Sequence, residues 1–134
     1  MSVNYVNPPG VHAPLGLYSH TATVPAGTNL VFISGQVGVR SDGTTPSSIA
    51  EQANQVFANI VAHLKFHGLE PTSIIKLTTF MVAGEDGDAV RAARIRHLGS
   101  HRPASTAVFV SALVEPAWLV EVEAIAASAS GTSS

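Results

Sequence analysis

The sequence predicts an α+β fold, a sandwich in which two helices pack on one face of a mixed β-sheet. Three observations lead to this prediction. Apolar residues recur at helical spacing over residues 49–64, and a shorter helical pattern follows at residues 88–98. The other segments are rich in β-branched residues and are bounded by glycine and proline. The chain of 134 residues is long enough for a single domain, which we expect over residues 1–127.

The N-terminal quarter predicts an extended lead-in followed by two strands. Residues 3–14 are rich in proline and glycine, whereas residues 15–24 have the composition of a strand. A turn cluster separates this segment from a second strand over residues 30–39. Gly35 inside the second strand indicates a bulge or a close approach of another group to the backbone. We expect the two strands to form a β-meander or hairpin.

The first helix has the clearest signals in the chain. Ser48 and Glu51 have the spacing of a capping box, and Gly68 has the position of a glycine that ends a helix. The apolar residues between them form one stripe at helical spacing: Ile49, Ala53, Val56, Phe57, Ile60, Val61 and Leu64.

The second half of the chain predicts a strand over residues 73–83, then a shorter helix over residues 88–98. Either Asp86 or Asp88 is the expected N-cap of that helix, and Gly99 is expected to end it.

Two more strands are expected over residues 105–113 and 119–127, followed by a disordered tail over residues 128–134. Because side chains alternate along a strand, the last strand presents two acids on one face. Val120, Val122, Ala124 and Ala126 are expected on one face, and Glu121, Glu123 and Ile125 on the other.

Composition excludes several classes of function. The chain has no cysteine, so disulfides and thiolate chemistry are excluded. A net charge of −2 without a basic patch predicts no nucleic-acid partner. With no apolar run long enough for a membrane span and no signal peptide, we expect a cytoplasmic protein without a membrane partner. Hydrophobic residues make up 46% of the chain and charged residues 12%, which favours a surface partly covered by other subunits.

Histidine spacing raises the question of a metal site. His63 and His67 stand four residues apart on the first helix, a spacing that can bind zinc, and His97 and His101 repeat it. Neither pair has a third ligand in range in the sequence, so we interpret them as surface histidines. We therefore expect no metal and no cofactor.

Six segments occur in the order found in a known family. The chain resembles the RidA/YjgF (reactive intermediate deaminase, Rid) superfamily, whose members are also called endoribonuclease L-PSP-like, from about residue 15 to residue 126. The segments that carry the resemblance are Gly16–His20, Val31–Gln36, Glu51–Val56, Ile75–Phe80, Arg102–Ala104 and Val120–Ala126.

This resemblance implies a chorismate-mutase-like fold and a homotrimer that binds small molecules in clefts between subunits. Active members of the superfamily hydrolyse enamines and imines, such as 2-aminoacrylate, to 2-oxo acids and ammonia. In them, an arginine directly after the Pro-Ala pair binds the substrate carboxylate, and a glutamate on the last strand positions the water. Both roles suit the groups, since a guanidinium matches a carboxylate and a carboxylate can orient water.

The chain departs from this pattern at the arginine. Ser105 follows Pro103-Ala104. Glu121 or Glu123 matches the family's glutamate, and Glu121 aligns better if one residue is inserted in the loop over residues 115–119. Arg91 and Arg94 stand on the second helix where active members usually carry asparagine and tyrosine. We therefore expect hydrolysis of the usual 2-imino acids to be impaired, absent or redirected to another substrate.

The expected catalytic residue is Glu121. The expected substrate-binding residues are Tyr18, Ser34, Gly35, Arg91, Arg94, Arg102, Ser105 and Glu123. Several have structural alternatives: Arg102 in a structural role or at an interface, the two helix arginines on a solvated or salt-bridging face, and the glutamates in a charge pair or a capping role between subunits.

Two functions follow from these residues. One is hydrolysis of an imine, an enamine or a related small nitrogen metabolite other than the usual 2-imino acids. The other is a non-catalytic trimer that binds a metabolite or a partner through the same cleft. Ribonuclease activity, attached to some members of the superfamily, has little support because the chain lacks a basic groove and has few aromatic residues.

Overall fold

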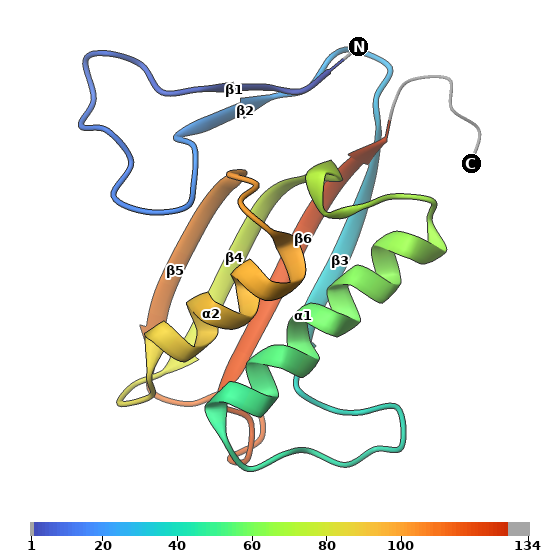
Figure 1. Cartoon of the computed structure of the whole chain (residues 1–134), viewed down its shortest axis with the longest axis vertical. Helices are drawn as coiled ribbons and strands as arrows, with labels where there is room; N and C mark the ends of the chain where they lie inside the picture. The colour runs from blue at the N-terminus through green and yellow to red at the C-terminus, as the bar shows by residue number, and fades with distance from the viewer. Residues whose placement is uncertain (1, 129–134) are drawn as a thin grey trace.

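Two helices lie side by side on one face of a four-stranded sheet in the computed structural model, which describes residues 2–128 (Figure 1). The elements in chain order are β1 (Asn4–Val6), β2 (Thr21–Thr23), β3 (Asn29–Val37), α1 (Ile49–Phe66), the 3-10 turn η1 (Pro71–Ser73), β4 (Ile74–Val82), α2 (Gly87–Leu98), β5 (Ala104–Val110) and β6 (Val120–Ser128).

The sheet is mixed, as the sequence predicts. Its strand order is β3-β6-β4-β5, with β4 and β5 parallel and both neighbours of β6 antiparallel to it. The helix α2 provides the crossover that two parallel strands require. The pairing of β3 with β6 shifts register between Ile33 and Gln36, which confirms the irregularity expected at Gly35.

The predicted N-terminal hairpin is wrong. β3 pairs with β6 at the far end of the chain. The short β2 pairs with β1, which lies in the segment expected to be only an extended lead-in. Most of the strand expected over residues 15–24 is a loop. Ser19 explains why, because its N–H donates to Pro103 O (3.0 Å) and its Oγ donates to Arg102 O (2.6 Å). These bonds hold the loop against the start of β5.

The helix α1 confirms its predicted limits. Glu51 N donates to Ser48 Oγ at 3.1 Å, and Gly68 adopts a positive φ of 71° just after the helix. The apolar stripe of α1 forms the centre of the core against the sheet. Its fully buried side chains are Ala53, Val56, Phe57, Ile60 and Leu64.

A buried glutamine ties α1 to two loops. Gln52 is 0% exposed, and its Nε2 donates to Pro46 O (2.9 Å) and Ala117 O (2.8 Å), while its Oε1 accepts from Leu119 N (2.9 Å). The side chain thereby provides hydrogen bonds for three backbone groups that no strand or helix pairs. Gly38 leaves room for it, because a Cβ at Gly38 would lie 2.8 Å from Gln52 Cα.

Of the two aspartates expected to cap α2, Asp86 is the N-cap. Asp86 Oδ1 accepts a hydrogen bond from Asp88 N at 2.9 Å. The other predicted boundaries shift slightly. β5 ends at Val110, and Ser128, expected in the tail, is the last residue of β6. The rest of the expected tail, residues 129–134, lies outside the described residues.

His97 on α2 makes stability depend on pH. Its burial, and then the charge of Arg96, lower the pKa of His97 below the usual value. The fold therefore favours the neutral imidazole, and its contribution to stability is present above the unfolded-state pKa of about 6.5. That contribution is lost as the pH falls from there towards the folded-state pKa. We expect the free energy of unfolding of His97→Gln to decline less than that of the wild type between about pH 7.5 and 5.5; parallel curves would contradict this.

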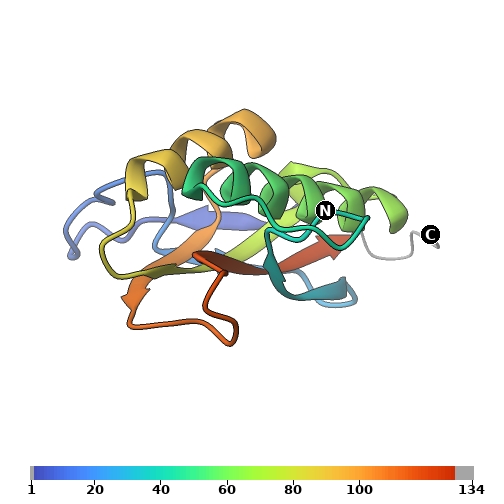
Figure 2. The same cartoon turned by 90° about the horizontal axis from the view of Figure 1, so that it is seen from below.

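The sheet face opposite the helices is open. Figure 2 shows both helices on one side of the sheet, and no helix among residues 2–128 covers the other side. Phe32 is 71% exposed there and Val108 is 40% exposed. An apolar face of this kind is typical of a surface that another chain covers. None of the described helices has the length and apolar character to cross a membrane.

Candidate functional site

Most of the predicted site residues fall into two groups on opposite faces of the sheet. Ser105 pairs with the buried Leu77, and its Oγ accepts a hydrogen bond from Arg94 of α2, so it lies on the helix face. Glu121 pairs with Phe80, three residues further along β4 than Leu77. Because cross-strand partners share a face and successive residues alternate, Glu121 lies on the open face. The alternation expected for β6 is confirmed, since Val120, Val122, Ala124 and Ala126 are buried.

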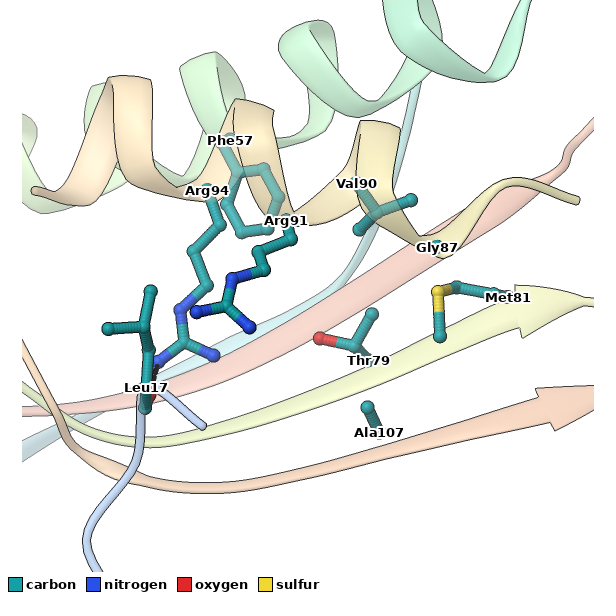
Figure 3. A pocket seen from close by; sticks show the side chains of 9 residues that line it. All are labelled: Leu17, Phe57, Thr79, Met81, Gly87, Val90, Arg91, Arg94 and Ala107. Carbon is teal, nitrogen blue, oxygen red and sulfur yellow. Dashed lines mark hydrogen bonds between the residues drawn. The ribbon is translucent and has the colours of Figure 1, made fainter. Parts of the chain in front are cut away.

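On the helix face, a cavity of about 130 Å³ lies between α2 and the strands (Figure 3). Arg91 and Arg94 extend from α2 towards the sheet and form its polar side. The residues that line it are Leu17, Phe57, Thr79, Met81, Gly87, Val90, Arg91, Arg94 and Ala107. The cavity thus combines two guanidinium groups with an apolar interior.

Arg94 brings its charge next to Ser105. Its Nη1 donates to Ser105 Oγ at 3.3 Å and its Nη2 donates to the carbonyl of Leu17. Burial, and then the charge of Arg91, lower the pKa of Arg94 from its usual value. A cation therefore lies beside the position where the family resemblance led us to expect one, but it comes from α2 and not from β5.

Two predicted binding residues hold the loop before β2 and are not among the residues that line this cavity. Arg102 Nη1 donates to Gly16 O at 3.1 Å, and Tyr18 Oη accepts from Leu15 N at 3.1 Å. Arg102 is exposed and makes a structural contact, which was the alternative role weighed for it. Neither side chain lies next to Ser105 in the way that Arg94 does.

On the open face, the Glu121 carboxylate lies directly over the backbone of Gly35. A Cβ added at Gly35 would lie 2.8 Å from Glu121 Cδ and closer still to its Oε2. Glycine at this position is therefore a steric requirement for the position of the carboxylate. The close approach expected at Gly35 is present, and the group that approaches is the predicted catalytic residue.

A second, wider hollow of about 330 Å³ brings Ser34 and Glu123 together on the open face. Lys76 and Thr78 of β4 also line it, and Lys76 Nζ donates to Thr106 Oγ1 at 2.9 Å. The sequence reasoning missed Lys76. The sequence contains a pattern that could have identified it. Lys76 and Thr78 flank the apolar Leu77 on a predicted strand, so the two polar side chains lie on the face opposite Leu77.

The histidines of the described chain were candidates for a metal site. No group of three or more His, Cys, Asp or Glu side chains that could hold a metal occurs within residues 2–128. His63 Nε2 lies 3.0 Å from Gln36 Oε1, and His101 Nε2 lies 2.7 Å from Ile74 O, so each contacts a neighbouring strand.

Comparison with known proteins places this architecture in a family. The family model described as Endoribonuclease L-PSP matches residues 10–128. A 2-iminobutanoate/2-iminopropanoate deaminase of Dermatophagoides farinae is 30% identical over 122 residues, which cover 90% of this chain and 92% of the relative.

Solved structures agree with this assignment. The Rid family protein YyfB of Yersinia pestis, of unknown function, superposes with a TM-score of 0.82 at 25% identity, covering 94% of this chain and 98% of that one. E. coli TdcF, solved with bound serine, superposes with a TM-score of 0.70 at 28% identity, covering 87% of this chain and 92% of that one. The chain therefore belongs to the Endoribonuclease L-PSP family, within the RidA/YjgF superfamily.

Proposed function

We propose that the protein is a homotrimer whose clefts between subunits hydrolyse a small imine or enamine, or a related nitrogen metabolite, other than the usual 2-imino acids. Glu121 positions the attacking water. An enamine first tautomerises to the imine, as a proton moves from nitrogen to carbon. Water then adds to the carbon of the C=N bond, the resulting carbinolamine loses ammonia, and a carbonyl compound remains. The deaminase name of the Dermatophagoides relative and the serine bound to E. coli TdcF support this class of substrate.

The observation that carries this proposal is the place made for the Glu121 carboxylate over Gly35. A general base works only within hydrogen-bond reach of the water, so its position has to be fixed. Gly35 leaves the room that this position requires, because a Cβ there would collide with the carboxylate. The carboxylate is partly exposed on the open face, where a substrate or a neighbouring chain can reach it.

The arrangement of the two faces supports a cleft between chains. The four-stranded sheet separates Glu121 from Ser105 and Arg94 within one chain, so one small molecule cannot contact both groups there. An adjoining subunit that covers the open face would bring its own helix-face cavity towards Glu121. The exposed Phe32 and Val108 give that face the apolar surface that a lasting interface needs.

Ser105 supports a substrate other than the usual 2-imino acids. A serine hydroxyl offers one neutral hydrogen bond, which contributes about 1 kcal/mol net, whereas a bond to a charged group contributes about 1.5–3 kcal/mol. An arginine at this position would bind both oxygens of a carboxylate, and the side chain of Ser105 cannot do so.

A non-catalytic trimer that binds a metabolite or a partner is the second candidate, and the same serine favours it. Turnover separates the two candidates. We expect the wild type to release ammonia slowly from freshly generated 2-aminoacrylate and faster from another imine in a panel of side chains. No release above the uncatalysed rate from any member would establish the non-catalytic candidate.

Glu121→Gln tests the role of the carboxylate. The amide keeps the shape of the side chain but cannot accept a proton, so we expect kcat to fall by about 10²-fold or more. Glu115→Gln, in an exposed loop, is the matched control and should keep the wild-type rate. Light scattering on both variants should give a trimer. A Glu121→Gln enzyme with the wild-type kcat, or a monomer in solution, would overturn this account.

A further inference from the structure

We infer that a hollow on the outer side of the two helices is a binding site for a small phosphate ester that carries hydroxyl groups, such as a sugar phosphate. The hollow has a volume of about 480 Å³ and lies between α1, α2 and the loop after β3. It shares no lining residue with the α2 cavity or with the hollow on the open face, so the inference is independent of the proposed function. The polar residues that line it are Arg40, Glu51, Asn54, Gln55, Arg96 and His97.

The helix α1 presents one stripe of side chains to this hollow. Four residues recur at the spacing of one helix face, and none of them is buried: Glu51, Asn54, Gln55 and Ala58. The fully buried residues of α1 repeat this spacing from Ala53, two positions further on, which places them on the opposite side of the helix. The hollow therefore faces away from the sheet. A trimer that covers the open face of the sheet leaves it accessible to a ligand.

The hollow has positive charge although the chain has a net charge of −2. Arg40 and Arg96 share it with one acid, Glu51, and the ion pair of Arg40 with Glu51 is exposed and as long as 4.0 Å. This is the one ion pair among residues 2–128, so Arg96 has no acidic partner in that part of the chain. Burial, and then the charge of Arg96, lower the pKa of His97 below its usual value. An exposed, long ion pair contributes little, so both arginines can bind an anion.

Neutral oxygens hold the two guanidinium groups in place. Arg40 Nη1 donates to Thr44 Oγ1 at 3.1 Å. Arg96 Nη1 donates to Asn54 Oδ1, which also contacts His97 Nε2 at 3.3 Å. A guanidinium has five N–H donors, so most of the donors of each arginine remain for a ligand. Two such groups from different elements suit the three terminal oxygens of a phosphate ester.

Glu51 and Gln55 favour hydroxyl groups in the rest of the ligand. Among the described residues that line the hollow, Ala58 is the one apolar side chain, so an apolar group would gain little there. Inorganic phosphate would bring a like charge towards the Glu51 carboxylate, whereas a hydroxyl group can donate to it. Ser48 Oγ already donates to Glu51 Oε1 at 3.0 Å and thereby holds the carboxylate. The volume lies in the range of about 300–1,000 Å³ that is usual for small-molecule sites.

Calorimetric titration of the full chain tests the inference with ribose 5-phosphate as the probe. Inorganic phosphate lacks the hydroxyl-bearing carbons, ribose lacks the phosphate, and gluconate carries hydroxyl groups with a carboxylate in place of the phosphate. We expect ribose 5-phosphate to bind at least about 10-fold more tightly than each of these three. A smaller advantage over any of them, or no saturable binding of ribose 5-phosphate, would overturn the inference.

Variants assign the binding to this hollow. Arg40→Met and Arg96→Met each keep the aliphatic part of the side chain and should weaken ribose 5-phosphate at least about 10-fold, the loss of charged hydrogen bonds. The two arginines stand on separate elements, so a local disturbance in one variant does not affect the other. Lys65→Met is the matched control, because Lys65 is an exposed cation on α1 that does not line the hollow. Wild-type affinity in both arginine variants, or an equal loss in Lys65→Met, would overturn the assignment.

Glu51→Gln separates recognition of the hydroxyl groups from attraction of charge. The amide does not repel an anion, so inorganic phosphate should bind more tightly than it does to the wild type. Ribose 5-phosphate loses a hydrogen bond to a charged acceptor, so its advantage over inorganic phosphate should fall at least about 3-fold. An unchanged advantage would contradict the role of Glu51 and with it the hydroxyl-bearing ligand.

Discussion

Gly35→Ala should abolish most of the activity while the fold stays intact. The added Cβ would lie 2.8 Å from Glu121 Cδ, so the carboxylate has to move away from its position over the strand. Displacement of a catalytic group by about 1 Å costs about 10²-fold in rate, and we expect a fall in kcat of at least this size. The backbone tolerates alanine here because Gly35 does not have a positive φ.

Gly38→Ala is the informative comparison for this variant. A Cβ at Gly38 would meet the backbone of α1 at Gln52, which cannot swing aside as the end of a side chain can. We therefore expect Gly38→Ala to lose stability and Gly35→Ala to lose activity. Steady-state kinetics and thermal unfolding of both variants measure the difference. Wild-type kcat in Gly35→Ala would show that the position of Glu121 over Gly35 is irrelevant to the reaction.

Gln52→Leu should be among the most destabilising single changes in the core. Leucine has a similar volume but leaves the carbonyls of Pro46 and Ala117 and the N–H of Leu119 without their partner. Pro46 is buried and Leu119 half-buried, whereas Ala117 is exposed, so water can replace the bond to the Ala117 carbonyl. Each backbone group left unpaired away from water costs about 1–3 kcal/mol, so we expect the free energy of unfolding to fall by about 2 kcal/mol or more.

Denaturant unfolding measures this effect, with Gln55→Leu as the control on the same helix. Gln55 Nε2 donates only to Asn59 Oδ1, in a half-buried environment, and its loss should cost about 1 kcal/mol at most. If Gln52→Leu and Gln55→Leu lower the stability equally, the three bonds of Gln52 do not hold the loops to α1.

The parts of the fold that the sequence predicts well are those governed by local signals. The limits of α1 follow from Ser48, the apolar stripe and Gly68, all within one segment. The alternation in β6 correctly separates Glu121 from Val122. The N-terminal hairpin failed for the opposite reason. Residues 30–37 have the pattern of a strand, but nothing local states that β3 pairs with β6 about ninety residues later.

The same limit applies to the candidate site, whose residues can be proposed from the sequence but whose contacts cannot. Gly35 and Glu121 could be proposed from the sequence one at a time, yet their contact depends on the register of β3 against β6. The contact of Arg94 with Ser105 depends on how α2 crosses the sheet and on the direction of one long side chain. The sequence could therefore identify the arginine as a candidate but could not place its charge beside Ser105.

The position of Arg94 changes how the departure at Ser105 is understood. A serine in place of the family's arginine predicts a site without a cation. The structure has a guanidinium within hydrogen-bond distance of that serine, on a different element. A cation supplied by a different element, together with an apolar cavity next to it, supports the proposed change of substrate more than a simple loss of binding.

In the proposed function, each site combines Glu121 of one chain with the α2 cavity of another. This combination is tested most directly by mixing two inactive variants, Glu121→Gln and the double variant Arg91→Met/Arg94→Met, through co-expression in equal amounts. In a randomly mixed trimer about one quarter of the clefts contain both intact halves, so we predict about one quarter of the wild-type ammonia release. Activity no greater than that of the two variants measured separately would contradict a site shared between chains.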